Sequence, residues 1–134
     1  MDIGLCRLIE LQKISDSRGS LVSLERGNGV PFLIQRIYYI FDTAHEASRG
    51  YHAHKSLSQL AVCIKGSCRF ILDDGFSRSE ISLDSATKGL LIEGLIWREI
   101  YDFSSDCVLL VLASERYDET DYIRNYDNFL NLVR

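Results

Sequence analysis

The sequence predicts an all-β fold of jelly-roll type, closed by one C-terminal helix, and three observations carry this prediction. Short apolar runs follow one another at even spacing, separated by glycines and by the turn signal Asp73-Asp74-Gly75. Pro31 is the single proline, and no repeat or low-complexity stretch interrupts the runs. Beyond Tyr117 the apolar residues change to helical spacing. A chain of 134 residues fits one domain, residues 1–134.

The strands are expected in the following order. Two short extended segments, residues 7–14 and 21–25, flank a turn at residues 16–20. Eight further strands are expected at residues 36–41, 50–55, 59–64, 68–72, 79–83, 89–92, 95–103 and 107–114. Many short strands of this kind are typical of a sandwich or a barrel.

The C-terminal tail is expected to be a helix packed against the β body. Its apolar residues at helical spacing are Tyr122, Tyr126, Phe129, Leu130 and Val133. Acids gather near the start of this segment, where the helix dipole favours negative charge; they are Asp118, Glu119 and Asp121.

Composition excludes several classes of protein. The chain is 46% hydrophobic and 25% charged, which is typical of a globular protein. A net charge of −4 and a pI near 5.3 argue against a nucleic-acid partner, which needs a basic face. No apolar run is long enough to span a membrane and no secretory leader is evident, so the cytoplasm is the expected location.

The four cysteines are expected to be buried free thiols. Cys6, Cys63, Cys68 and Cys107 lie in apolar segments and lack zinc-ribbon or CxxC spacing. Cys63 and Cys68 flank a turn and can face each other across a hairpin, although a disulfide there is disfavoured in the cytoplasm.

The run RGYHAHK, residues 49–55, carries the clearest chemical signal. His52 and His54 are two residues apart, so an extended strand projects both imidazoles from one face. Such a pair suggests either a metal site or proton transfer. The third ligand expected on a late strand is missing, because Arg98 occupies that position and a guanidinium does not bind metals. The remaining histidine, His45, is expected to be exposed. A core or surface histidine doublet without chemistry is the structural alternative.

Proton transfer next to a carbonyl needs a neutral base and donors that stabilise the enolate. Arg98 and Arg18 are candidate donors, although Arg18 reads equally well as a solvated turn residue. Tyr38 can face the barrel and donate to a substrate oxygen, or be a core aromatic. Arg49 and Lys55 flank the histidines and can hold a phosphate, or be solvated strand ends.

Several segments together resemble the nucleotide-sugar 3,4-ketoisomerases of the WxcM-like cupin group. The matching stretches are SDSRGSL at residues 15–21, RIYYI at 36–40, RGYHAHK at 49–55, WRE at 97–99, DF at 102–103 and YDETDYIR at 117–124. The resemblance implies a cupin-type barrel, a homodimer, and a reaction without metal or cofactor on dTDP-4-keto-6-deoxyglucose. It further implies that the keto group moves from C4 to C3, for dTDP-3-amino-3,6-dideoxyhexose biosynthesis and bacterial surface glycans such as lipopolysaccharide O-antigen or S-layer glycan.

The resemblance also implies roles for single residues. His52 corresponds to the base at C3, and His54 to a neighbour that relays the proton. The positions of Arg18 and Arg98 vary in the group and are associated with the face on which C4 is protonated. Arg98 cannot act as a general acid as a histidine can, which favours the gluco over the galacto product. The competing hypotheses are a metal-dependent cupin enzyme, a non-catalytic sugar-nucleotide-binding module and a 3,5-epimerase.

Overall fold

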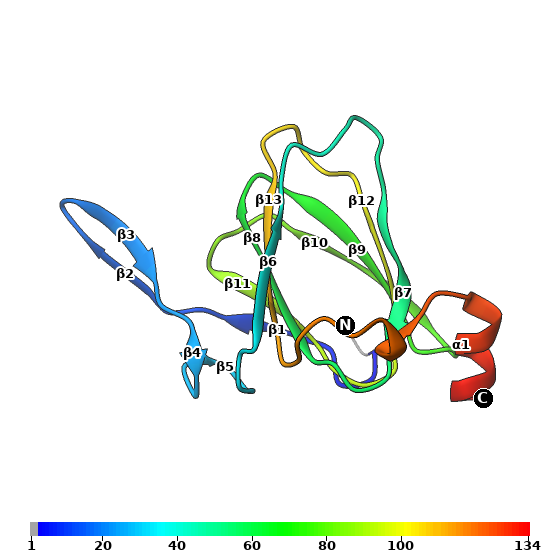
Figure 1. The fold of residues 1–134 in the computed structure, drawn as a ribbon. Helices are drawn as coiled ribbons and strands as arrows, with labels where there is room; N and C mark the ends of the chain where they lie inside the picture. Colours follow the sequence, from blue (N-terminus) through cyan, green and yellow to red (C-terminus); the bar gives the residue numbers. More distant parts are fainter. Residues whose placement is uncertain (1–2) are drawn as a thin grey trace.

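Two five-stranded antiparallel sheets face each other in the computed structural model, which describes residues 3–134 (Figure 1). The first sheet has the order β1 (Arg7–Glu10), β11 (Lys88–Ile92), β8 (Gln59–Lys65), β13 (Val108–Ala113) and β6 (Arg36–Ile40). The second has the order β10 (Arg78–Leu83), β9 (Cys68–Asp73), β12 (Trp97–Tyr101), β7 (Arg49–His54) and β14 (Tyr122–Ile123). The predicted all-β class with a C-terminal helix is confirmed, and seven of the eight expected strands from residue 36 onward agree to within one residue at each end, while β12 is shorter than expected.

Apolar side chains from both sheets fill the space between them. Phe70 and Leu72 of β9 meet Leu109 of β13 in this core. Strand β8 is buried on both faces, which explains its almost uninterrupted apolar sequence. Its outer face, including Leu60, is covered by a second apolar cluster to which Val30 and its neighbours contribute. The cavity between the sheets is therefore bounded on the β8 side by rigid, close-packed side chains.

The C-terminal helix begins later than the sequence pattern indicates. Residues 117–125 are not α-helical: a 3₁₀ turn, η1 (Glu119–Asp121), leads into β14, and α1 covers Tyr126–Val133. Strand β14 pairs with β7, which buries Ile123 beside Trp97 and Phe129. The free energy gained when β14 pairs with the open edge of β7 outweighs the helical preference of the local sequence. Among the described residues, no helix is long and apolar enough to cross a membrane.

Each of the two N-terminal segments is divided in the structure. The expected strand at 7–14 is split into β1 and β2 (Lys13–Asp16), because Leu11 turns inward and its N–H donates to the Thr87 carbonyl at 2.8 Å. The expected strand at 21–25 is split into β3 (Gly19–Val22) and β4 (Glu25–Arg26), and β4 pairs with β5 (Gly29–Val30). Strands β2 and β3 pair only with each other. They form a hairpin that projects away from the barrel (Figure 1).

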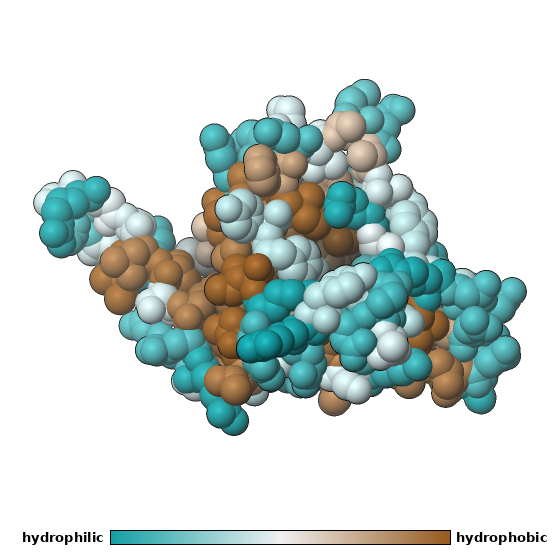
Figure 2. Space-filling view, viewed as in Figure 1, coloured by the Kyte–Doolittle hydropathy of each residue, from teal (hydrophilic) through white to brown (hydrophobic). Residues whose placement is uncertain are grey.

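Exposed apolar side chains gather on the hairpin and on the neighbouring edge strand β6. Ile14 and Leu21 are more than half exposed on the hairpin, and Ile37, Tyr39 and Phe41 are more than half exposed on and after β6. Figure 2 shows apolar surface both at the base of the hairpin and along β6. Exposed apolar side chains gathered in this way often mark a protein interface.

Candidate active site

A backbone bulge in β7 sets the position of His52. Gly50 and Tyr51 both have left-handed backbones, with φ of 88° and 60°, and the register with β12 shifts at this point. A Cβ on Gly50 would lie 2.9 Å from the Arg98 carbonyl oxygen, so only glycine fits. Tyr51 adopts a backbone conformation that is rare for a residue other than glycine, and this conformation is strained. The bulge places His52 directly opposite Arg98 on the neighbouring strand.

A cavity of about 600 Å³ lies between the sheets and contains most of the expected site residues. Four of them line it, namely Tyr38, Arg49, His52 and Arg98. Tyr38 comes from β6 of the first sheet, and the other three come from the neighbouring strands β7 and β12 of the second sheet. The volume suits a small organic ligand.

His52 is a neutral base in this environment. Burial and then the positive charge of Arg98 lower the pKa of His52 to about 4. Its Nδ1 is buried without a hydrogen-bond partner among the described residues. The imidazole ring packs edge-on against His54, with 4.8 Å between ring centroids, and lies tilted against Tyr122 at 5.0 Å. At neutral pH the ring is unprotonated and available to accept a proton.

His54 lies directly behind His52 and is held by a carboxylate. Its side chain is fully buried, and its Nδ1 lies 3.1 Å from Oδ2 of Asp121. The other Asp121 oxygen accepts from the backbone N–H of Ser56 at 2.8 Å. Burial, Arg98 and His52 lower the pKa of His54 to about 2, so this contact is a hydrogen bond from a neutral imidazole rather than an ion pair. Nδ1 then carries the proton, and the unpartnered Nε2 is free to accept one.

Arg98 is a buried cation with only neutral partners. The residue is 2% exposed, and its guanidinium donates to Oε1 of Gln59 at 2.5 Å and to the Ile96 carbonyl at 2.9 Å. Gln59 in turn donates to the Tyr38 hydroxyl at 3.0 Å. Burial lowers the pKa of Arg98 to about 10, which leaves it charged at neutral pH. Since no carboxylate within the described range pairs with it, its field is available to an anion in the cavity.

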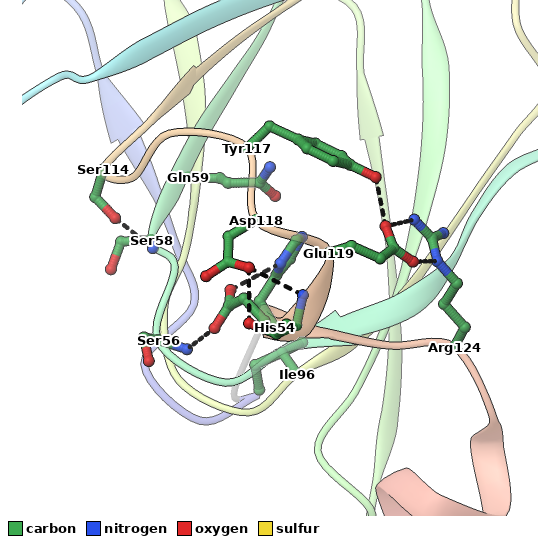
Figure 3. A network of polar contacts seen from close by, with 12 residues as sticks. His54, Ser56, Ser58, Gln59, Ile96, Ser114, Tyr117, Asp118, Glu119 and Arg124 are labelled. Carbon is green, nitrogen blue, oxygen red and sulfur yellow. Dashed lines mark hydrogen bonds and ion pairs between the residues drawn. The ribbon is translucent and has the colours of Figure 1, made fainter.

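The segment 117–124 forms part of the site, and the sequence interpretation missed it. The Glu119 carboxylate accepts from Nε and Nη2 of Arg124 at 2.6 and 2.9 Å and from the Tyr117 hydroxyl (Figure 3). The Arg124 guanidinium stacks 4.2 Å above the centre of the Tyr122 ring. Tyr117, Tyr122 and Arg124 line the cavity. The available signal was Asn125, a good N-cap residue that places the helix start after this segment.

Four residues singled out from sequence do not line the cavity: His54, which is buried behind His52, and the exposed residues Arg18, Lys55 and His45. Arg18 is at the hairpin tip, where its side chain is 87% exposed and forms an ion pair with Asp16 at 2.6 Å. Lys55 is exposed and does not line the cavity, although its backbone N–H donates to the Asp121 carbonyl at 3.0 Å. His45 is almost fully exposed, as expected.

The fold and this site define a cupin-type barrel enzyme with acid–base groups in its cavity. Residues 5–134 match the family described as "FdtA: WxcM-like, C-terminal". A TDP-4-oxo-6-deoxy-alpha-D-glucose-3,4-oxoisomerase from Aneurinibacillus thermoaerophilus is 59% identical over 127 residues, which cover 95% of this chain and 91% of that protein. The chain therefore belongs to the FdtA family of WxcM-like proteins, and it is an enzyme of the sugar-nucleotide 3,4-ketoisomerase class.

Solved structures agree with this assignment. WlaRA, a TDP-fucose-3,4-ketoisomerase from Campylobacter jejuni, superposes with a TM-score of 0.95 at 35% identity, covering 98% of this chain and 97% of that one. The 3,4-ketoisomerase QdtA from Thermoanaerobacterium thermosaccharolyticum gives 0.93 at 44% identity, covering 96% and 93%. That QdtA structure is a histidine-to-asparagine mutant in complex with TDP-4-keto-6-deoxyglucose.

Proposed function

We propose that this enzyme moves the keto group of dTDP-4-keto-6-deoxyglucose from C4 to C3 by histidine-mediated proton transfer. The observation that carries the proposal is that a neutral His52 and the buried, charged Arg98 are register partners on neighbouring strands and line the same cavity. The C4 ketone acidifies the proton on C3, and His52 removes it. The resulting enediolate carries its negative charge on O4, where a buried guanidinium stabilises it strongly.

The shift is completed by three further proton movements. O4 takes up a proton, the C3 hydroxyl loses its proton to become the new ketone, and C4 receives a proton on carbon. His54 is placed to relay protons to and from His52, because its Nε2 is free while Asp121 holds its Nδ1–H. The net change moves one hydrogen from C3 to C4 and one from O3 to O4, so no oxidant, metal or cofactor is required.

Substrate binding is assigned to Tyr38, Arg49 and Lys55. Tyr38 presents its hydroxyl to the cavity, where the hydrogen bond from Gln59 orients it toward a sugar oxygen. Arg49 lines the same cavity and offers a charge-assisted contact to the diphosphate. Lys55 lies outside the cavity wall, so its proposed contact is with a part of the nucleotide that extends beyond it.

Arg18 is proposed to act in the active site of a partner subunit of a homodimer. Within one chain it lies on a hairpin that leaves the barrel, so it cannot serve the site of its own chain without a large movement (Figure 1). The exposed apolar residues of the hairpin and of β6 supply a surface that a second copy would bury. Exchange of a projecting element between identical subunits is an established route to symmetric dimers.

The gluco product is proposed over the galacto product, for use in dTDP-3-amino-3,6-dideoxyhexose biosynthesis. Arg98 retains its proton at neutral pH, so it stabilises charge but does not deliver a proton to C4. The hydrogen removed from C3 and the hydrogen gained at C4 of the gluco product lie on opposite faces of the ring, so the proposed proton reaches C4 from the face opposite the one that His52 deprotonates.

Product analysis tests the proposal. Purified enzyme treated with a chelator is incubated with dTDP-4-keto-6-deoxyglucose, and the product is assigned by NMR, directly or after an aminotransferase has trapped it. A 3-keto sugar with an equatorial C4 hydroxyl is expected. An unchanged substrate refutes the assigned reaction, and a C4-epimeric product refutes the stereochemical part alone.

A further inference from the structure

Three buried thiols meet at one end of the barrel, away from the histidine pair. Cys63 lies near the end of β8, Cys68 begins β9, and Cys107 directly precedes β13. Their sulfur atoms all lie within 4.8 Å of one another, and each residue is at most 2% exposed. The Sγ atoms of Cys63 and Cys107, 44 residues apart in sequence, are separated by 3.4 Å.

We propose that Cys63, Cys68 and Cys107 form a binding site for one thiophilic metal ion, Zn²⁺. A metal–sulfur bond of about 2.3 Å places three sulfur ligands of one ion about 4 Å apart. The 3.4 Å pair and the 4.8 Å upper limit bracket this spacing, so small side-chain rotations suffice to accommodate an ion. Three sulfur ligands select soft ions and disfavour Mg²⁺ and Ca²⁺, which require oxygen.

Charge favours a divalent over a monovalent thiophilic ion. Three thiolates around Zn²⁺ leave a net charge of −1, whereas the same ligands around Cu⁺ leave −2, which costs more in a buried site. Burial raises the pKa of Cys107 to about 12, and the pKa of Cys63 is also raised, chiefly by its hydrogen bond with Cys68 and by burial. Binding replaces three S–H bonds by three Zn–S bonds and releases three protons to solvent.

A second cavity borders the cysteine cluster at Cys107. This cavity, of about 400 Å³, is lined by Cys107 together with Tyr39, Asp42, Lys65 and Asp106. The lining carries two carboxylates against the single cation Lys65, which favours a cation over an anion in this cavity. A water molecule from this side is the proposed fourth ligand.

The loop around the site is already fixed before any ion binds. Gly66 has a φ of 69°, and a Cβ there would lie 2.2 Å from the Ser104 hydroxyl. That hydroxyl accepts from the Ser67 backbone N–H at 2.9 Å and donates to Asp106 at 2.7 Å. Pre-organised ligands bind with less loss of conformational entropy.

Zinc at this position would have a structural role. Strands β8 and β13 belong to one sheet and β9 to the other, so an ion held by all three cysteines links the two sheets. The site contains neither His52 nor Arg98, and its occupancy is independent of the proposed proton transfer.

Metal titration of the reduced, full-length protein tests this site. Zn²⁺ is added in competition with a chromophoric chelator, and proton release is recorded in weakly buffered solution. We expect one ion and three protons per chain, and a charge-transfer band in the ultraviolet when Cd²⁺ replaces Zn²⁺. The variant C68A should bind at least about 100-fold more weakly. The variants C6A, which removes the fourth buried cysteine, and H52N should bind like wild type.

Several results would overturn the proposal. These are no stoichiometric binding by the reduced wild-type protein, release of fewer than two protons, unchanged affinity in C68A, or loss of binding in H52N. The proton count and the Cd²⁺ spectrum use only the wild-type chain, so they decide the question even if C68A fails to fold.

Discussion

The cavity wall and the β2–β3 hairpin each carry an arginine that the sequence singles out, and the two arginines are in opposite situations. Arg98 is buried and fixed by hydrogen bonds to Gln59 and to a backbone carbonyl. Arg18 lies in solvent, and within residues 3–134 its ion-pair partner is Asp16, two residues away. Burying a cation without a carboxylate partner costs folding free energy, so its presence here points to a function. An exposed ion pair of this kind contributes little to stability. One chain therefore brings His52 and Arg98 together, whereas the role proposed for Arg18 requires a second chain.

The largest expected effect comes from His52 in the cavity wall. The variant H52N keeps a polar side chain of similar shape but removes the base, so we expect kcat to fall by about 10²- to 10⁴-fold. The measurement is the rate of 3-keto product formation at saturating substrate. The matched control is H45N, which alters an almost fully exposed histidine and should leave kcat unchanged. Full activity in H52N would show that His52 is not the base.

Two substitutions of Arg98 separate the effect of its charge from that of its geometry. R98Q removes the cation and should lower kcat by about 10²- to 10³-fold, as does the loss of an oxyanion-stabilising donor. R98K keeps the charge but cannot reach both the Gln59 oxygen and the Ile96 carbonyl, so an intermediate kcat is expected. Equal kcat values for wild type and R98Q would show that Arg98 is only structural.

Mixed dimers test whether Arg18 acts across subunits. R18A alone should lower kcat by roughly 10- to 10²-fold, as expected for loss of a charge-assisted contact. When R18A and H52N chains are refolded together, half of the dimers contain one site with both residues intact, so about a quarter of wild-type activity should return.

The two possible outcomes of this mixing are distinct. Recovery requires that His52 and Arg18 of one site come from different chains. If Arg18 serves its own chain, every site in the mixed dimer lacks one of the two residues, and activity stays at the level of the separate variants. Wild-type activity of R18A by itself would exclude a catalytic role on either chain.

The pH dependence gives the smallest but most specific effect. Because burial lowers the pKa of His52 to about 4, its base form persists well below pH 6.5, and kcat/KM should decline only as pH falls toward 4. Stability behaves differently: the unfolded state takes up protons on both histidines from about pH 6.5 downward, so the free energy of unfolding should decrease from there as pH falls. An acid limb of kcat/KM near 6.5 would contradict the buried, neutral His52.

The sequence predicts those parts of the site that depend on local alternation. His52, Arg98 and Tyr38 face the cavity because residues two apart on a strand share a face. The contact of His54 with Asp121 spans 67 residues and depends on β14 pairing with β7, which no local pattern encodes. The bulge at Gly50 and Tyr51 and the approach of Cys107 to Cys63 likewise arise only when particular strands pair. The early helix start was wrong because helical spacing of aromatics was read without the capping signal of Asn125.

The most direct test of the central claim is hydrogen exchange during turnover in D₂O. If His52 removes the C3 proton and the proton that reaches C4 comes from groups in exchange with solvent, NMR of the product should show deuterium at C4, and recovered substrate should gain deuterium at C3. H52N should show neither. Exchange at C5 would indicate a 3,5-epimerase, and the absence of any exchange in active, folded wild-type protein would contradict His52 as a base that shares its proton with solvent.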